Sequence, residues 1–328
     1  IREALFNPDL SRTFDRRSYD EGNIRDGVVS IQHGAVHRAR RRVENTMFRP
    51  DILRLYEFGL FPDTMERLLD ALLGGSEADL YAVAELLAAV LAARRAGIDL
   101  EPDDVDTLRR VVAIVDAFSQ GSAILDARDP DAVRRLVYET YQVFERDFVG
   151  PSRRRREALL ERHARGEISD GELTQDILTV LLRHRQDPAL ALSDDGRLTR
   201  EVATYLQGGT HTSGQVAVNA IDLLFAADPG MLERVASDLL FAQRVVHETL
   251  RLRPTTPRMR RRAEADTTVG GRAIPRDAVV TCTTATALHC AAVLPLHAVK
   301  HASGVGSLPA ATVILAHAPA GVFCGNQQ

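Results

Sequence analysis

Apolar residues recur at intervals of three and four along most of residues 1–253, and this periodicity constrains the fold more than any other feature of the sequence. The spacing is that of one face of an α-helix. Clear examples are Ile52-Leu53-Leu55-Tyr56, Leu68-Leu69-Leu72-Leu73 and Leu86-Leu87-Val90-Leu91. We therefore expect a mainly α-helical protein.

Local signals indicate where some of these helices begin and end. Ser169 and Glu172 form a capping-box pattern before an apolar run at 177–182, because each side chain can hydrogen-bond the backbone N–H of the other residue. Pro254 cannot continue a helix, so it should end the helix that carries Glu248 and Arg251.

Two further stretches differ from the helical pattern. Between residues 266 and 281, short runs of β-branched residues surround Gly270-Gly271, which predicts a small β-hairpin. The basic run at 153–156 could attract phosphate, but acidic residues follow it at Glu157 and Glu161. We therefore interpret the run as a solvated helix face.

Length and composition exclude several classes of protein. The chain has 328 residues, 26% of them charged, and a formal net charge of −4, which favours neither a nucleic-acid partner nor disorder. The longest apolar stretches, 82–93 and 308–323, are shorter than the ~20 residues of a membrane-spanning helix. We expect a cytoplasmic protein that begins inside a longer reading frame, because the first residues lack both Met and a signal-type apolar core.

Composition changes abruptly near residue 280. Residues 281–328 contain no acid and no arginine, yet they hold all three cysteines, Cys282, Cys290 and Cys324. Alanine, threonine and histidine are frequent there, whereas a buried β-region would be rich in valine and isoleucine. We expect a partial helical domain at 1–280 and an atypical tail at 281–328. The tail is either a frame change or foreign segment, or a genuine but unusual end.

The segment Gly208-Gly209-Thr210-His211-Thr212-Ser213 lies inside a helical pattern that runs from about residue 199 to 226. Each glycine costs a helix about 1 kcal/mol relative to alanine. Two reasons for the pair are open: a flat ligand approaches the backbone there, or the glycines form a kink that serves packing only and binds no ligand. The hydroxyl of Thr212 can donate to the carbonyl oxygen of Gly208, four residues earlier, and open a local bulge for a small polar ligand.

Two more pairs share a helix face. Glu248 and Arg251 are three residues apart, in the context ETLRLRP, and can form an ion pair. His37 and Arg41 are four apart on a basic helix expected at 32–47, where they suit a carboxylate or propionate ligand. Because each pair is common by itself, a solvated surface helix is the alternative in both cases.

In this order, the three groups resemble the cytochrome P-450 superfamily of haem-thiolate monooxygenases. That family has a His-x-x-x-Arg helix, then a Gly-Gly-x-acid-Thr helix, then a Glu-x-x-Arg helix. Pro254, Arg261 and Gly270-Gly271 also resemble the short sheet that follows in the family. The resemblance covers about residues 1–280 and implies a helical fold of the soluble bacterial type, with a small β-hairpin region and with segments missing at both ends.

The resemblance also implies roles for these residues. His37, Arg41 and Arg261 would hold the propionates of heme b, while Gly208, Gly209, His211 and Thr212 would form the catalytic helix segment. Thr212 would help deliver protons to dioxygen, and Glu248 with Arg251 would form a structural pair. His211 stands where the family usually has an acid, a variation seen in its sterol-demethylase branch.

The thiolate that ligates the haem iron is expected at Cys324. Family members carry Phe-Gly-x-Gly-x-His-x-Cys-x-Gly, and this chain has Gly321-Val322-Phe323-Cys324-Gly325-Asn326, with a different spacing and without the His. A second interpretation takes Cys282, His289, Cys290, His297 and His301 as a metal cluster, but their spacing matches no standard zinc motif.

Two functions follow as expectations. The first is a haem-dependent monooxygenase that inserts one oxygen atom from dioxygen into an apolar small molecule, with electrons from a ferredoxin-type or flavoprotein donor. The second is a non-catalytic remnant, or a protein that binds apolar small molecules without a competent haem site.

Overall fold

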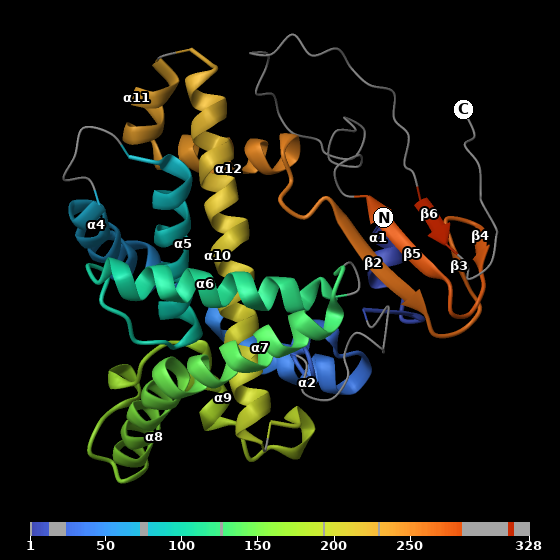
Figure 1. Cartoon of the computed structure of the whole chain (residues 1–328), viewed down its shortest axis with the longest axis horizontal. Coiled ribbons are helices and arrows are strands. Elements are labelled where there is room, and N and C mark those ends of the chain that lie inside the picture. Colours follow the sequence, from blue (N-terminus) through green and yellow to red (C-terminus); the bar gives the residue numbers. More distant parts are fainter. Residues whose placement is uncertain are drawn as a thin grey trace. The chain divides into compact units, whose positions relative to one another are not determined.

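The computed structural model describes residues 2–12, 24–72, 78–124, 127–192, 194–228, 230–283 and the strand at 314–317. The chain divides into two compact units, one of residues 15–214 and one that joins residues 1–14 to residues 215–328. Helices dominate the described residues (Figure 1), which confirms the predicted mainly α-helical fold. The predicted change of character at residue 280 stays a prediction, and strand β5 (Val279–Thr283) runs across that position.

The unit of residues 15–214 is built from helices joined by short turns. Its core contains an edge-to-face pair, Phe118 and Phe144, whose ring centroids are 5.4 Å apart. Its helices are α2 (Gly34–Glu44), α3 (Pro50–Arg54), α4 (Phe61–Leu72), α5 (Leu80–Ala96), α6 (Val105–Ser122), α7 (Pro130–Phe144), α8 (Gly150–Ala164), α9 (Ile177–Arg183) and the first part of α10 (Asp195–Phe225). Two π-helical segments, η4 (Leu55–Leu60) and η6 (Glu145–Val149), connect α3 to α4 and α7 to α8. The 3₁₀ turns are η2 (Val29–Ile31), η3 (Asn45–Phe48), η7 (Asp170–Glu172) and η8 (Pro188–Leu190).

Aspartates begin several of these helices. Asp79, Asp104, Asp129 and Asp176 each accept hydrogen bonds from backbone N–H groups in the first turn of α5, α6, α7 and α9. An N-terminal carboxylate satisfies an otherwise unpaired donor and interacts favourably with the helix dipole. The predicted capping box of Ser169 and Glu172 is present, but it closes the short turn η7, and α9 begins later.

The basic run at 153–156 is only partly solvated, so its interpretation as a solvated helix face was wrong in part. The side chain of Arg156 is 5% exposed and pairs with Asp176 and Asp99, each at 2.9 Å. Arg153 is also largely buried and pairs with Glu145 at 2.8 Å. The first and last arginines of the run therefore turn inward while Arg154 and Arg155 are exposed, because positions three apart lie on the same helix face.

The second unit contains two small antiparallel sheets and the remaining helices. The predicted hairpin is formed by β3 (Thr267–Val269) and β4 (Arg272–Ile274), with Gly270 and Gly271 at φ +57° and +74° in the turn. A four-stranded sheet has the order β1-β2-β5-β6. Its strands are β1 (Leu10–Ser11), β2 (Arg258–Ala263), β5 and β6 (Ile314–His317), and the helices of this unit are α1 (Arg2–Phe6), α11 (Gly230–Ser237), α12 (Leu239–Leu252) and the end of α10.

This four-stranded sheet joins distant parts of the sequence. Leu10 pairs with Ala263, and Met259 pairs with Cys282 on the other side of β2. Leu10, Ala263 and Cys282 belong to one small buried cluster. As predicted, α12 ends before Pro254, at Leu252.

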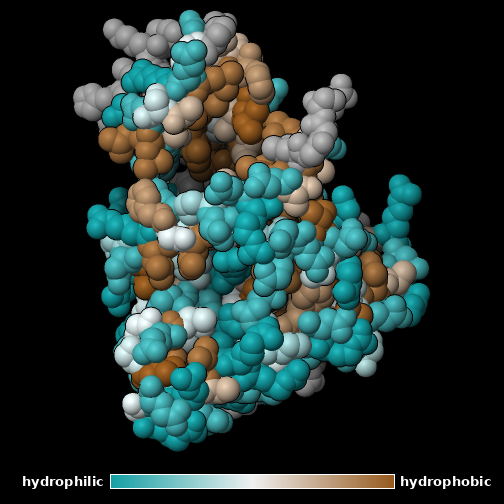
Figure 2. Space-filling model, turned by 90° about the vertical axis from the view of Figure 1, so that its left-hand side faces the viewer, coloured by the Kyte–Doolittle hydropathy of each residue, from teal (hydrophilic) through white to brown (hydrophobic). Residues whose placement is uncertain are grey.

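One face of the protein is mixed in character, with hydrophilic residues over much of it and hydrophobic residues gathered in patches (Figure 2). Ion pairs account for part of the hydrophilic surface. Arg67, for example, contacts Glu101 at 2.9 Å and Asp103 at 2.7 Å. Exposed pairs of this kind contribute little to stability because water screens them, so the buried pairs are more informative about the fold.

Gly97, which ends α5, has two reasons to be glycine. Its φ is +96°, and a Cβ built there would lie 2.5 Å from the Cβ of Leu178 and 2.6 Å from a carboxylate oxygen of Asp176. Gly97→Ala should lower the free energy of unfolding by roughly 2–4 kcal/mol, since left-handed strain and overpacking add. Gly166 has φ +74°, and no atom of the described segments lies within 4 Å of a Cβ built there, so Gly166→Ala should cost only about 1 kcal/mol. Urea denaturation of both variants measures the difference, and equal losses would show that the close contact is unimportant.

Candidate functional site

The glycine pair of α10 meets two different environments. Among the described residues, no atom lies within 4 Å of a Cβ built on Gly208, so this position is open in the described part of the chain. A Cβ on Gly209 would lie 2.7 Å from the Cβ of Ala92, and one on Gly214 would lie 3.3 Å from the carbonyl oxygen of Ala84. Gly209 and Gly214 therefore let α5 pack closely against α10, whereas Gly208 leaves a bare stretch of backbone.

Thr212 lies one turn after Gly208 on the same side of α10. As predicted, its hydroxyl donates to the carbonyl oxygen of Gly208, at 2.6 Å. The expected bulge does not form, because α10 remains a regular α-helix from 195 to 225. Thr212 is half-buried. Its hydroxyl oxygen has lone pairs left to accept a further hydrogen bond.

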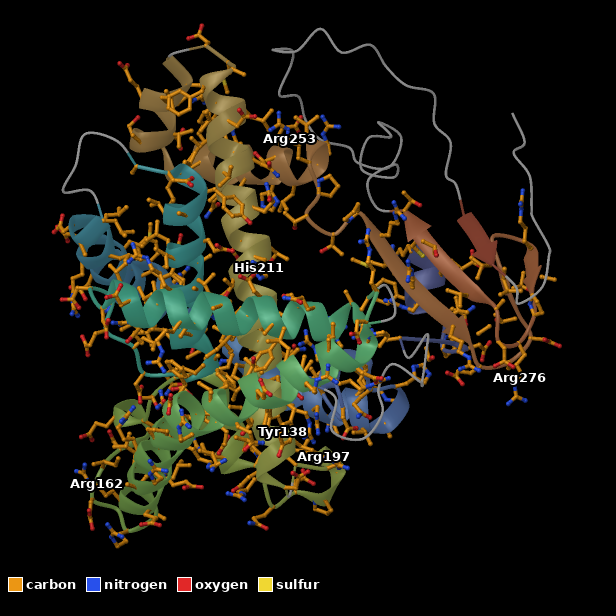
Figure 3. The ribbon with its side chains drawn as sticks, in the orientation of Figure 1. Tyr138, Arg162, Arg197, His211, Arg253 and Arg276 are labelled. Carbon is orange, nitrogen blue, oxygen red and sulfur yellow. The ribbon has the colours of Figure 1, made fainter. Side chains whose placement is uncertain are left out.

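His211 lies in the middle of α10, where the helix passes α6 (Figure 3). Its Nδ1 is 3.0 Å from Oε1 of Glu85 on α5, and its Nε2 is 3.3 Å from Oδ1 of Asp116 on α6. The histidine side chain is 29% exposed, and the two acids are 19% and 57% exposed. One imidazole thus connects two carboxylates from two other helices, and the outer carboxylate reaches solvent.

A buried ion pair joins α2 to α10. Arg40 and Glu201 are 2.7 Å apart, and their side chains are 1% and 0% exposed. The guanidinium also donates to the carbonyl oxygens of Gly27, Leu190 and Ala191. Both carboxylate oxygens of Glu201 accept from the backbone N–H of Val29. Burial raises the pKa of Glu201 to about 8, although Arg40 opposes this shift.

A second buried carboxyl, Glu44, lies beside this pair. One of its oxygens accepts a hydrogen bond of 2.7 Å from the hydroxyl of Tyr205, and among the described residues the other oxygen has no partner. Burial raises the pKa of Glu44. Arg41 donates to Tyr205 at 3.3 Å and lies 3.7 Å from Glu44, with 39% of its side chain exposed. His37, one turn earlier on α2, is half-buried.

The predicted pair Glu248 and Arg251 is present on α12. Two hydrogen bonds of 2.8 and 2.6 Å join the guanidinium to the carboxylate, and the interaction raises the pKa of Arg251. Arg261 lies on β2, half-buried, and burial lowers its pKa. Cys282 is buried in the same sheet, where burial raises the pKa of its thiol.

The predicted site residues are thus distributed over three parts of the chain. His37, Arg41, Gly208, Gly209, His211 and Thr212 belong to the unit of residues 15–214, whereas Glu248, Arg251 and Arg261 belong to the other unit. Cys324 lies outside the described residues, as do Cys290 and the histidines of the alternative metal cluster, His289, His297 and His301. Their predicted roles stay predictions.

Sequence reasoning missed the partners of the site residues. Arg40 is one of several arginines in a row, and nothing in the sequence distinguishes the buried one from its neighbours. Glu85 and Asp116 lie far from His211 along the chain. The one available signal was the position of Glu85 relative to the apolar residues of α5. Glu85 lies one helical turn before Ala89 and beside Leu86, both of which are buried, so it belongs to an inward-facing part of the helix.

Comparison with known proteins supports the resemblance. The family model described as Cytochrome P-450 matches residues 2–293. A curated relative, the cyclooctat-9-en-7-ol 5-monooxygenase of Streptomyces melanosporofaciens, is 24% identical over 309 residues, which are 85% of this chain and 62% of the relative. The chain therefore spans less than two thirds of the length of this relative.

Solved structures share the fold. The crystal structure of CalO2 aligns with a TM-score of 0.68 and 19% identity, over 94% of this chain and 73% of that one. A cyanobacterial structure with bound retinoic acid also aligns with a TM-score of 0.68, at 17% identity, over 88% of this chain and 65% of that one. Among the described residues, no helix combines the length and the apolar character that crossing a membrane requires.

The buried carboxyl of Glu201 predicts a specific dependence of stability on pH. Its pKa is raised from the ordinary value of 4.5 to about 8 in the folded chain, so the folded state binds more protons than the unfolded state between these values. The free energy of unfolding should therefore fall as the pH rises from about 4.5 to about 8, by at most about 1.4 kcal/mol per pH unit. Glu201→Gln should reduce this slope, which urea denaturation at several pH values measures.

The control for this prediction is Glu172→Gln. Ser169 lowers the pKa of Glu172, so the contribution of this exposed carboxylate is lost only as the pH falls below about 4.5. The control variant should keep the wild-type slope between pH 5 and 8. A Glu201→Gln variant with the same slope as wild type would contradict the assignment.

The adjacent glycines of α10, Gly208 and Gly209, give opposite predictions for the haem-free chain. Gly209→Ala should lower the free energy of unfolding by roughly 1–3 kcal/mol, because the new methyl group collides with Ala92. Gly208→Ala should raise it by up to about 1 kcal/mol, because alanine is the better helix former and the position is open. Thermal or urea unfolding compares the two, and the same change for both would refute the assignment of Gly209 to helix packing.

Proposed function

The chain belongs to the cytochrome P-450 family, and from this premise we propose that it acts as a haem-dependent monooxygenase. Members of the family bind heme b. When bound, the haem supplies the iron chemistry that activates dioxygen, and the protein supplies orientation, protons and exclusion of water. The proposed reaction inserts one oxygen atom into an apolar small molecule.

The observation that carries the proposal is the Gly208–Thr212 side of α10. A flat macrocycle needs a surface without protruding side chains, and Gly208 faces open space. The hydroxyl of Thr212, held by its bond to the Gly208 carbonyl oxygen, lies on the same side. A haem would fit against this side of α10. The hydroxyl of Thr212 would then face the haem and could accept and pass on a proton.

We assign His211 to the supply of protons. Asp116 is 57% exposed, so its carboxylate contacts solvent, and Nε2 of His211 is 3.3 Å away. Imidazole is the side chain best suited to carry protons near neutral pH. His211 and Thr212 are adjacent on α10, so the proposed route connects solvent at Asp116 to the Thr212 side of the helix.

The haem propionates are the proposed partners of His37, Arg41 and Arg261. Arg41 keeps 39% of its side chain exposed, so its guanidinium is available to a carboxylate ligand. Glu248 and Arg251 have the proposed structural role, and their bidentate contact supports it.

Relatives support an apolar substrate. The curated relative is named for cyclooctat-9-en-7-ol, and the cyanobacterial structure contains retinoic acid. We propose a substrate of similar apolar character, and a ferredoxin-type or flavoprotein electron donor. A cytoplasmic location also belongs to the proposal.

A carbon monoxide difference spectrum tests this function. The full chain, reconstituted with heme b and reduced, should give the Soret band of a thiolate-ligated haem, because the axial ligand determines the spectrum. Cys324→Ala should abolish that band if Cys324 is the ligand. Cys282→Ala is the matched control and should retain it, since Cys282 is buried in a β-sheet.

The alternative function gives a different result. A non-catalytic protein that binds apolar small molecules would take up no haem on reconstitution, and this outcome would refute the monooxygenase. An unchanged band in Cys324→Ala would leave the monooxygenase in place and move the thiolate to another cysteine.

A further inference from the structure

The cluster of Glu85, Asp116 and His211 combines donor groups that could hold a metal ion. One donor atom from each residue lies within 4.8 Å of the other two. The three residues come from α5, α6 and α10, all within the unit of residues 15–214. We propose that they bind a divalent transition-metal ion of the zinc class.

Charge distinguishes this cluster from the other ion pairs of the protein. The chain has 41 lysines and arginines, and most of its acidic side chains in ion pairs contact an arginine, as Asp99 contacts Arg156. Among the described residues, Glu85 and Asp116 have no arginine or lysine within ion-pair distance, and both contact the same imidazole. Two carboxylates share one histidine, which leaves an excess of negative charge that a divalent cation would neutralise.

The packing of α5 on α10 holds the donors in place. Gly214 brings the backbone of α10 close to Ala84 and Glu85, and Gly209 does the same at Ala92. His211 lies between these two contacts, so the backbones on both sides of the Glu85–His211 contact are fixed by close packing. A rigid scaffold of this kind lowers the cost of collecting metal ligands.

The donor set favours zinc-class ions over magnesium or calcium. Imidazole suits zinc, copper, iron and nickel, whereas calcium and magnesium prefer sites made only of oxygen atoms. Zinc bonds of about 2.0–2.2 Å to nitrogen and oxygen place tetrahedral donors about 3.3–3.5 Å apart, so the donors must move closer by up to about 1.4 Å. Because Glu85 contacts Nδ1 and Asp116 contacts Nε2, one carboxylate must also turn from its imidazole nitrogen to the ion. One imidazole nitrogen would ligate the ion.

Solvent access supplies the remaining ligand. Asp116 is 57% exposed, and Glu85 lines a pocket of about 290 Å³ together with Asp79, Leu86 and Val112. A water molecule can complete a four-coordinate site from either direction. The metal site uses no haem and no residue of the tail, but it shares His211 and Asp116 with the proposed proton route, and a bound ion would interrupt that route.

Titration of the full haem-free chain with Co²⁺ tests the site. Cobalt replaces zinc and reports its ligands by visible absorption, and sulfur-to-cobalt charge-transfer bands identify any Co²⁺ held by cysteines. Wild type should bind one Co²⁺ through nitrogen and oxygen ligands, and Zn²⁺ should displace it. His211→Ala, Glu85→Gln and Asp116→Asn should each weaken this binding by more than about a hundredfold, beyond the ~10–100-fold that loss of an outer-sphere contact causes.

His163→Ala is the matched control. His163 contacts Asp170 at 3.1 Å, but no second carboxylate completes a cluster there among the described residues, so the variant should bind Co²⁺ as wild type does. Asp116→Asn changes an exposed side chain, and its circular dichroism should remain that of wild type. Co²⁺ should also raise the melting temperature of wild type and not that of Asp116→Asn.

Two results would overturn the proposal. One is a folded His211→Ala chain that binds Co²⁺ with wild-type affinity through nitrogen and oxygen ligands. The other is a loss of binding in His163→Ala as large as the loss in the three cluster variants, because nonspecific surface histidines would then account for the signal.

Discussion

The unit of residues 15–214 depends on a single guanidinium that is almost completely removed from water. Arg40 joins the 3₁₀ turn at 188–190, the backbone at Gly27 and the carboxylate of Glu201 to helix α2. It also bonds the carbonyl oxygen of Ala191, whose φ of +51° is unusual for a residue with a side chain. Burying a charge is costly unless every donor finds an acceptor, so these segments can adopt one arrangement only. That arrangement fixes the start of α10.

Different positions along α10 make different contacts. Glu201 and Tyr205 anchor its first turns in the buried network, while Gly209 and Gly214 receive α5. The Thr212 side is left bare beside Gly208, and His211 faces two acids on other helices. A helix anchored at one end and packed closely in its middle holds polar groups at fixed positions. Such rigidity is what both a proton route and a metal site require.

Features governed by neighbours in sequence were predictable, and features governed by distant residues were not. The helices follow from periodicity, and the contacts Thr212–Gly208 and Glu248–Arg251 follow from four- and three-residue spacing. Nothing local indicated that Arg40 is buried while Arg38 is exposed, because adjacent arginines differ only in what lies across from them. The pairing of Leu10 with Ala263, and the approach of Glu85 to His211 across 126 positions, depend on topology that no short pattern encodes.

Because α5 and α10 pack closely at Ala92 and Gly209, the side-chain size that one position tolerates depends on the other. A methyl group already occupies the space between the helices, so a larger residue at 92 is tolerated only if α5 moves away from α10. Any such movement also carries Glu85, since it lies two turns earlier on the same rigid helix. A larger side chain at this apolar contact would thus change the distance between Glu85 and His211. Natural selection would then act on position 92 through the function of His211 as well as through the stability of the fold.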